Sequence, residues 1–189
     1  MIVEDFSLIP MGPFSDPAWR ASPAGFAPTI VAVPTSVDRS LRVQVASDGA
    51  AVAACRDLEP ALPRITVDTI LRVDGDQGAG PLLAVGIRQG AVRLGRDRGQ
   101  RLTLGDSETT GATDLRIMPG DWYRLIVDVD PESGTYRLDA EAVDRPAARV
   151  RREGLALGRP SAATEGICYT ASGAAGASVT IDEIRITAR

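Results

Sequence analysis

Residues 122–143 read WYRLIVDVDPESGTYRLDAEAV, and this stretch decides the fold class. Apolar and polar residues alternate on both sides of the central DPESG, with Tyr123 and Tyr136 on the apolar face. Alternation with a period of two is typical of a strand that is buried on one face and exposed on the other. Pro and Gly in a short polar segment favour a turn. The stretch therefore predicts an antiparallel hairpin whose tyrosines face a core and whose charged residues face outward.

The same alternation extends over most of the chain. Turn-forming segments rich in Gly, Pro, Asp and Ser separate the alternating runs, and no long window has helical periodicity. Strands with one apolar face close best as two stacked sheets, so the sequence predicts an all-β, two-sheet antiparallel β-sandwich of jelly-roll type. We expect it to occupy residues 1–189 as a single domain, with residues 9–28 as a long ordered loop. The expected strands are residues 2–8, 28–33, 39–46, 50–55, 64–73, 82–88, 91–95, 100–104, 122–130, 134–143, 165–171 and 178–187.

The composition excludes several classes of chemistry. The chain has no His, Lys or Asn, and its 21 basic residues are all Arg. Without His it has neither a Ser-His-Asp triad nor an imidazole metal ligand, and without Lys it has no Schiff base and no P-loop lysine. The missing residues have A/T-rich codons, which predicts a GC-rich bacterial genome.

The charge and hydropathy patterns narrow the range of partners. A net charge of −4 argues against nucleic acid and anionic membranes, because phosphate binding needs an excess of basic residues. No apolar run approaches the roughly 18 residues of a membrane span, so we expect no membrane insertion. The first ten residues lack the basic region of a secretory signal.

Cys55 and Cys168 lie far apart in the sequence, each in a strand-like segment, and form no C-x-x-C pair. Two interpretations stay open: two buried thiols, or one disulfide if the two strands are neighbours.

The last expected strand breaks its own alternation. Val179 and Ile181 share one face, whereas Ile184 and Ile186 have the opposite parity. A slip of one residue predicts a β-bulge at residues 182–183, a feature that often lies at a sheet margin or beside a ligand site.

The first expected strand carries an acidic residue on its apolar face, because Glu4 has the parity of Ile2 and Phe6. If the two terminal strands pair, Glu4 and Asp182 converge near one margin. Carboxylates together with bulge carbonyls suit Ca²⁺, a hard cation that prefers oxygen ligands. The sequence therefore predicts a structural calcium site at Glu4 and Asp182. The alternative is that Glu4 lies at a frayed end and Asp182 caps a turn.

The chain contains the segments EDFS (4–7), PGDWYRLIVDVDPESGTYRL (119–138) and SVTIDEIRI (178–186). Together they resemble the concanavalin A-like lectin/glucanase superfamily, and within it the laminin-G-like modules and the bacterial modules associated with carbohydrate-active enzymes. The resemblance covers nearly the whole chain as strand order and loop placement. It implies a two-sheet jelly roll that binds glycans on its concave sheet or loop rim. It also implies a structural Ca²⁺ near the paired termini, where Glu4 and Asp182 would lie.

The catalytic pattern of that superfamily is missing. Its retaining glucanases carry E-x-D-x-x-E on one strand, and the most similar strings here are the same-face pairs Asp128/Asp130 and Asp139/Glu141. Both pairs lie beside Arg residues that favour the ionised carboxylate, and an ionised carboxylate cannot act as a general acid. The polysaccharide lyases of this fold typically use His and Tyr with an Asn or Gln neutraliser, and this chain has neither His nor Asn. We therefore expect no catalytic residue, although a hydrolase or lyase with an atypical site remains a third hypothesis.

Ligand binding is expected to combine aromatic rings with charged groups. Trp122 falls on the polar face of its strand and Trp19 on the long loop, so both are candidates for stacking on sugar rings. Arginines can grip carboxylates bidentately, which favours an acidic polysaccharide. The alternative is that the polar face is plain solvated surface. The predicted ligand-binding residues are Trp122, Arg124, Asp128, Arg137, Arg42, Arg72 and Trp19.

These observations favour a non-catalytic carbohydrate-binding or accessory module in a bacterial secreted or cell-surface system. Its expected partner is a polysaccharide or glycan. The alternative is a structural domain whose exposed sheet mediates adhesion or assembly without sugar.

Overall fold

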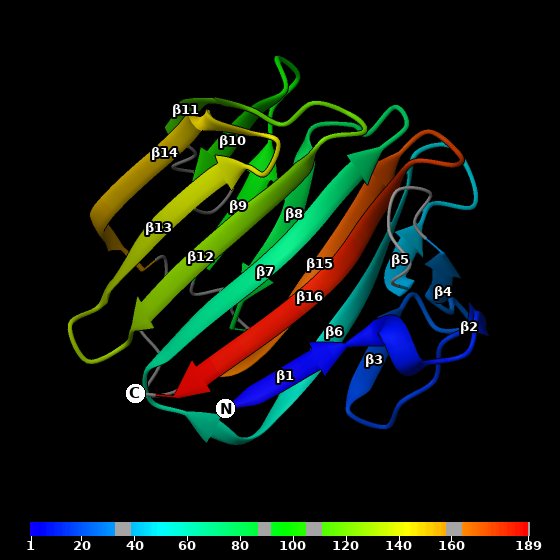
Figure 1. Cartoon of the computed structure of the whole chain (residues 1–189), viewed down its shortest axis with the longest axis horizontal. Helices are drawn as coiled ribbons and strands as arrows, with labels where there is room; N and C mark the ends of the chain where they lie inside the picture. Colours follow the sequence, from blue (N-terminus) through cyan, green and yellow to red (C-terminus); the bar gives the residue numbers. More distant parts are fainter. Residues whose placement is uncertain (33–38, 87–91, 105–110, 158–163, 189) are drawn as a thin grey trace.

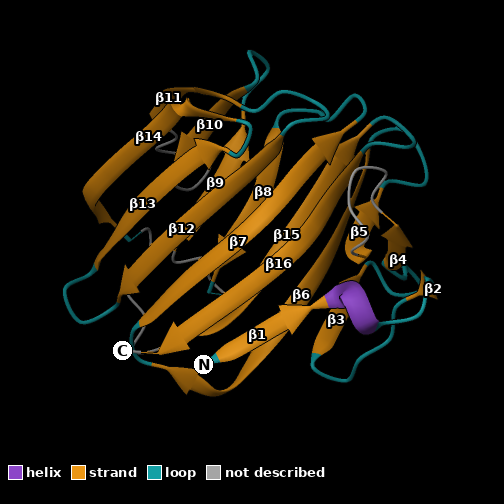
Figure 2. Cartoon of the chain, viewed as in Figure 1, coloured by secondary structure: helices purple, strands orange, loops and turns teal. Residues whose placement is uncertain are grey.

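The computed structural model describes residues 1–32, 39–86, 92–104, 111–157 and 164–188. These residues form sixteen strands and one short 3-10 turn, η1 (Phe6–Leu8), and strands dominate Figure 2. Within the same ranges no helix is long and apolar enough to cross a membrane. The all-β prediction is confirmed.

Two antiparallel sheets stack face to face, as Figure 1 shows with sheet A in front. Sheet A contains, in spatial order, β14 (Arg145–Ala156), β13 (Thr135–Ala142), β12 (Trp122–Asp130), β7 (Ile65–Asp74), β16 (Ser178–Ala188), β5 (Arg39–Gln44), β4 (Thr29–Ala32) and β2 (Gly12–Pro13). β1 (Ile2–Asp5) also pairs with β16, on the same edge as β5. Sheet B contains β11 (Gly111–Arg116), β10 (Arg101–Leu104), β9 (Val92–Arg96), β8 (Gly80–Val85), β15 (Thr164–Gly173), β6 (Ala50–Leu62) and β3 (Trp19–Ser22).

The inner faces of the two sheets enclose one hydrophobic core. Along β7 every second residue is buried, beginning with Ile65 and Val67. Burying each such side chain stabilises the fold by about 1.5–3 kcal/mol. Thr69 is the polar residue in this buried series, and its Oγ1 accepts a hydrogen bond at 2.9 Å from the hydroxyl of Tyr169 on β15. The inward hydroxyl of Thr69 therefore has a hydrogen-bond partner within the core.

The hairpin predicted at residues 122–143 is confirmed. β12 and β13 pair in continuous register from Tyr123 opposite Ala142 to Asp130 opposite Thr135. Gly134 completes the turn with φ 66°, a conformation that glycine adopts without steric cost. Tyr123 and Tyr136 are both buried, so their parity follows the sequence pattern.

The terminal strands also pair, with Ile2 opposite Ile186 and Glu4 opposite Ile184. The register of β16 against β7 shifts between Ile181 and Glu183, which is the predicted bulge. Before the bulge in sequence, β16 pairs with β5, and after the bulge it pairs with β1. The register shift therefore lies where β16 changes partner.

Four strands lie outside the predicted set: β2, β3, β11 and β14. β2 and β3 fall in the stretch predicted as a loop, so that expectation is wrong for these residues. β14 forms the edge of sheet A, and of its 12 residues only Val150 is buried. A strand with a single buried residue has no alternation to detect. The predicted strand ends at residues 33, 87–88 and 91 lie outside the described residues.

Cys55 of β6 and Cys168 of β15 are direct partners across adjacent strands and form a disulfide. The sequence left this question open, and the pairing of β6 with β15 answers it. Both residues are half-buried on the outer face of sheet B, where their neighbours in β6 are the small residues Ala51 and Ala53.

Candidate functional site

Six of the seven predicted ligand-binding residues lie on the outer face of sheet A, five of them on three neighbouring strands. Trp122, Arg124 and Asp128 project from β12, with Arg72 on β7 and Arg137 on β13. The register places Arg72 opposite Trp122, and Arg137 opposite Asp128. Alternation on three neighbouring strands therefore brings these five side chains to one face.

Each charged residue near Trp122 already has a partner. The Arg72 guanidinium lies 5.4 Å from the centroid of the Trp122 ring, and its Nε donates to Asp74 at 2.8 Å. Arg124 donates from Nε and Nη2 to the two carboxylate oxygens of Asp68, at 2.9 and 2.6 Å. This hydrogen bonding raises the pKa of Arg124 above its ordinary value. One face of Trp122 is thus covered by a guanidinium and does not offer an open stacking platform.

The other carboxylates of this face are held by arginines as well. Asp128 forms an ion pair with Arg137 and accepts a hydrogen bond from Thr66. Asp139 pairs with Arg149 of β14, and the hydrogen bond from Arg149 lowers the pKa of Asp139 below its ordinary value. A carboxyl that stays ionised cannot donate a proton as a general acid. This geometry argues against a catalytic acid at Asp139.

Trp19 does not lie on an exposed loop, and that expectation is wrong. It begins β3 and is 9% exposed, because the pairing of β3 with β6 turns its side chain toward the core. The ring packs edge-to-face with Phe6 and Phe14 and stacks on Tyr169, with centroids 6.5 Å apart. Trp19 therefore stabilises the end of the sandwich rather than presenting a stacking surface.

The strands that carry Glu4 and Asp182 pair with each other, but each of these two side chains has a protein partner. Glu4 faces inward and accepts a hydrogen bond from Nε of Arg56 at 2.7 Å, with both side chains at most 20% exposed. Asp182 accepts from Ser40 Oγ at 2.9 Å. Ca²⁺ takes six to eight oxygen ligands, and an arginine on Glu4 opposes a cation there. In the part of the chain that the structure describes, no group of three or more acidic or Cys residues gathers around a possible metal position. The present arrangement does not fit a calcium cage, so the calcium site stays a prediction.

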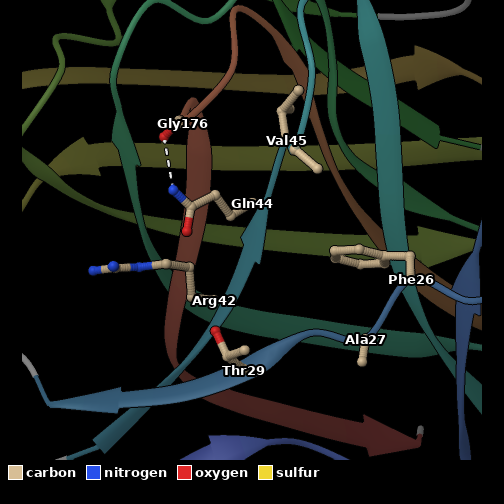
Figure 3. Close-up of a pocket in the computed structure, with 8 residues that line it drawn as sticks. Phe26, Ala27, Thr29, Arg42, Gln44, Val45 and Gly176 are labelled. Carbon is tan, nitrogen blue, oxygen red and sulfur yellow. Dashed lines mark hydrogen bonds between the residues drawn. The ribbon is translucent and has the colours of Figure 1, made fainter.

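Arg42, the seventh predicted residue, lines a pocket at the other end of sheet A. The Arg42 pocket has a volume of about 440 Å³ and is formed by residues 26, 27 and 29, the end of β5 with the two residues that follow, and Gly176 in the turn before β16. Arg42 and Gln44 project from the same face of β5, and the Phe26 ring points toward that strand (Figure 3). Gln44 Nε2 donates to the Gly176 carbonyl at 3.4 Å.

A hollow larger than the Arg42 pocket lies on the outer face of sheet B, and the sequence analysis missed it. This sheet B pocket has a volume of about 610 Å³, and small or polar residues from four adjacent strands line most of it. They include Gly80, Ala84, Arg93, Gly95, Thr103 and Thr170.

Glycine is required at the floor of the sheet B pocket. A Cβ at Gly95 would lie 2.7 Å from the Gly80 carbonyl oxygen and 2.9 Å from Thr103 Oγ1. Gly95 thus lets neighbouring strands approach closely and keeps the surface hollowed. The signal in the sequence is the row of small residues at outward positions, which a solvated surface also tolerates. The sequence alone therefore could not distinguish this pocket from a solvated surface, because the order of the strands was unknown.

Comparison with known proteins rests on structure, because no family model and no curated protein matches the sequence. The metal-free lectin I-B4 from Griffonia simplicifolia superposes with a TM-score of 0.61 at 10% identity, over 99% of both chains. The exoplasmic/lumenal domain of VIP36, in its Ca²⁺/Man3GlcNAc-bound form, superposes with a TM-score of 0.56 at 11% identity, over 92% of this chain and 84% of that one. The chain has a lectin-like β-sandwich fold.

This lectin-like sandwich also matches part of larger proteins. A sialidase superposes with a TM-score of 0.62 at 12% identity, over 90% of this chain but 17% of the sialidase. The chain thus spans about a sixth of that enzyme. At these identities the likeness concerns the concanavalin A-like fold alone.

Proposed function

We propose that this chain is a non-catalytic carbohydrate-binding or accessory module that recognises a polysaccharide through the sheet B pocket. The observation that carries the proposal is a hollow of about 610 Å³ across adjacent strands of a lectin-like sandwich. Ligand pockets commonly measure about 300–1,000 Å³. A floor of small residues lets a sugar ring lie close to the sheet, and Arg93, Thr103 and Thr170 supply hydrogen-bonding groups around it.

The carboxylates near this pocket support binding without catalysis. Asp97 is the acidic residue in its lining, and it forms an ion pair with Arg101 at 2.8 Å. Hydrogen bonds, chiefly from the Arg101 backbone, lower the pKa of Asp97. Retaining hydrolysis needs two carboxyl groups about 5–5.5 Å apart, one of them able to donate a proton. Among the described residues that line the pocket, Asp97 is the single carboxylate, and one ionised carboxylate does not supply this pair.

We place the module in a bacterial secreted or cell-surface system, as its resemblance to modules associated with carbohydrate-active enzymes implies. The Cys55–Cys168 disulfide supports an oxidising compartment, because disulfides persist outside the reducing cytosol. In such a system a binding module raises the effective concentration of a linked enzyme on its polymer.

The second candidate is a structural interaction domain without sugar binding. The outer face of sheet A favours it, since many of its arginines and carboxylates are paired with one another and form an extended polar surface. Ion pairs such as Arg124–Asp68 hold that surface in a fixed arrangement.

Binding to a panel of neutral and uronate polysaccharides, by affinity electrophoresis with Ca²⁺ and then EDTA, tests the proposal. Ala84→Trp fills the sheet B pocket with a large ring and should abolish retention. Trp122→Ala alters the opposite face and should retain binding. Both variants need an unchanged circular dichroism spectrum for the comparison to hold. If no polysaccharide retards the native chain, the proposal is wrong and the structural domain is favoured. Shortening of the polymer would overturn the non-catalytic part.

A further inference from the structure

The Arg42 pocket lies on a different sheet from the sheet B pocket and differs from it in chemistry. It joins three segments that are distant in sequence, and Arg42 sits at its charged side. On β5, Arg42 stands between Thr29 of β4 and Thr180 of β16, its direct partners in the sheet.

Arg42 differs from Arg72, the other arginine of this row, in having no carboxylate partner among the described residues. Arg72 lies on the far side of Thr180 in the same row and is held by Asp74 and Trp122. For Arg42, no carboxylate within the described ranges lies at ion-pair distance. Its Nε is buried and has no hydrogen-bond partner. A guanidinium with a buried, unpartnered Nε and no counter-charge is suited to take an anion.

A second polar atom in the same row is also unsatisfied. Thr180 is 1% exposed, and its Oγ1 has no hydrogen-bond partner among the described residues. Buried polar groups are nearly always paired, so two orphans on adjacent strands call for a common explanation.

The rest of the pocket provides what a sugar ring requires. Phe26 is half-buried and contributes an apolar ring, while Gln44 is exposed and presents a planar carboxamide on the same side as Arg42 (Figure 3). Aromatic faces pack against the C–H surface of a ring, and amides exchange hydrogen bonds with hydroxyls. Arginine binds carboxylates in a bidentate, planar geometry.

We infer that the Arg42 pocket binds the carboxylate of an acidic saccharide, with Arg42 as its counter-ion, Phe26 as the apolar wall and Gln44 as a hydroxyl partner. The inference rests on the proposed carbohydrate-binding function but uses a separate pocket on the other sheet. Its ligand is a pyranose that carries a carboxylate, such as a uronate residue of a polysaccharide.

The test compares galacturonate with galactose, which share a ring and differ in the carboxylate. Titration of ¹⁵N-labelled protein at constant ionic strength follows the Arg42 Nε–H and Gln44 side-chain amide resonances. Galacturonate should shift both, with an affinity at least tenfold higher than that of galactose. Acetate and inorganic phosphate serve as anions without a sugar ring and should bind at least several-fold more weakly than galacturonate.

The matched variants are Arg42→Gln and Arg185→Gln. Arg185 lies on the same sheet but is exposed and paired with Glu183 of its own strand, so its loss should leave galacturonate binding unchanged. Arg42→Gln should reduce the affinity at least tenfold. If that variant does not fold, Phe26→Ala provides the second test and should weaken galacturonate binding several-fold.

Each outcome separates this inference from the proposed function. Equal affinity for galactose and galacturonate, or binding that survives Arg42→Gln, overturns the carboxylate pocket. Equal affinity for acetate or phosphate overturns the saccharide ligand. If Ala84→Trp abolishes polysaccharide binding while galacturonate does not shift the Arg42 resonances, the sheet B pocket is supported and this inference is wrong. The reverse result supports this pocket and not the other. In that case galacturonate shifts the Arg42 resonances in both the native chain and Ala84→Trp, while the native chain binds no polysaccharide.

Discussion

Replacing Cys55 and Cys168 together by alanine tests how much the cross-strand disulfide contributes to stability. The pair joins β6 to β15, next to the β3 edge of sheet B, and closes a loop between residues 113 positions apart. Without the link the folded contacts of the two strands remain, and the unfolded chain gains conformational freedom. The double variant is preferred to single substitutions because it leaves no free thiol.

The size of the effect follows from the length of the closed loop. For a separation of 113 residues, the chain-entropy relation gives a loss of about 4.8 kcal/mol at 25 °C, while measured disulfides contribute about 2–4 kcal/mol. We therefore expect the free energy of unfolding to fall by about 2–5 kcal/mol. With an unfolding entropy of about 2.1 cal/mol/K per residue over 189 residues, the melting temperature should fall by about 5–12 °C.

Urea denaturation followed by circular dichroism measures this difference. The m-value should also rise, because an uncrosslinked unfolded chain exposes more surface. The oxidised protein treated with reductant serves as the control and should match the double variant. A change in free energy below about 1 kcal/mol would contradict a disulfide that restrains the unfolded state.

Three further predictions concern packing, titration and metal. Gly95→Ala should destabilise the fold by about 1–3 kcal/mol, because its Cβ would meet a backbone carbonyl, whereas Gly111→Ala, with open space around its Cβ, should change the free energy of unfolding by less than about 0.5 kcal/mol in the same urea titration. Burial raises the pKa of Tyr169 far above its ordinary value, so the unfolded chain loses this proton near pH ~10 while the folded chain keeps it. The free energy of unfolding should therefore fall above that pH, and Tyr169→Phe should flatten the decline; an equally steep profile in the variant would contradict this cause. Adding Ca²⁺ should leave the melting temperature unchanged relative to EDTA because Glu4 is already neutralised; a rise that Glu4→Gln and Asp182→Asn both abolish would instead support the calcium site that the sequence predicted.

The fold was predictable where one face of a strand is buried and the other solvated. The hairpin of β12 and β13 follows from its alternation, and so does the bulge of β16, because a slip of one residue exchanges inward and outward positions. β14 was not predictable, since an edge strand with Val150 alone buried has no repeating pattern. β3 was missed because a short strand with an inward tryptophan reads as part of a loop rich in Pro and Gly.

The candidate sites were less predictable than the fold, because they depend on which strands become neighbours. Alternation placed Arg124 on a polar face, but its partner Asp68 lies 56 residues earlier on β7. The disulfide was undecidable for the same reason. The sheet B pocket combines β8, β9, β10 and β15, whose small outward residues carry no signal singly. The unsatisfied Nε of Arg42 is visible only once the surrounding carboxylates have been placed.

The pairing of β1 with β16 has a consequence for how such a domain is joined to others. The strand that opens the fold and the strand that closes it lie side by side, with Ile2 opposite Ile186, and the two chain ends meet at one corner of the molecule (Figure 1). A polypeptide that enters and leaves at one corner can be spliced into a surface loop of a host without stretching either connection. The domain would then be attached to its host at one corner of sheet A, and the outer face of sheet B would stay clear of both connections.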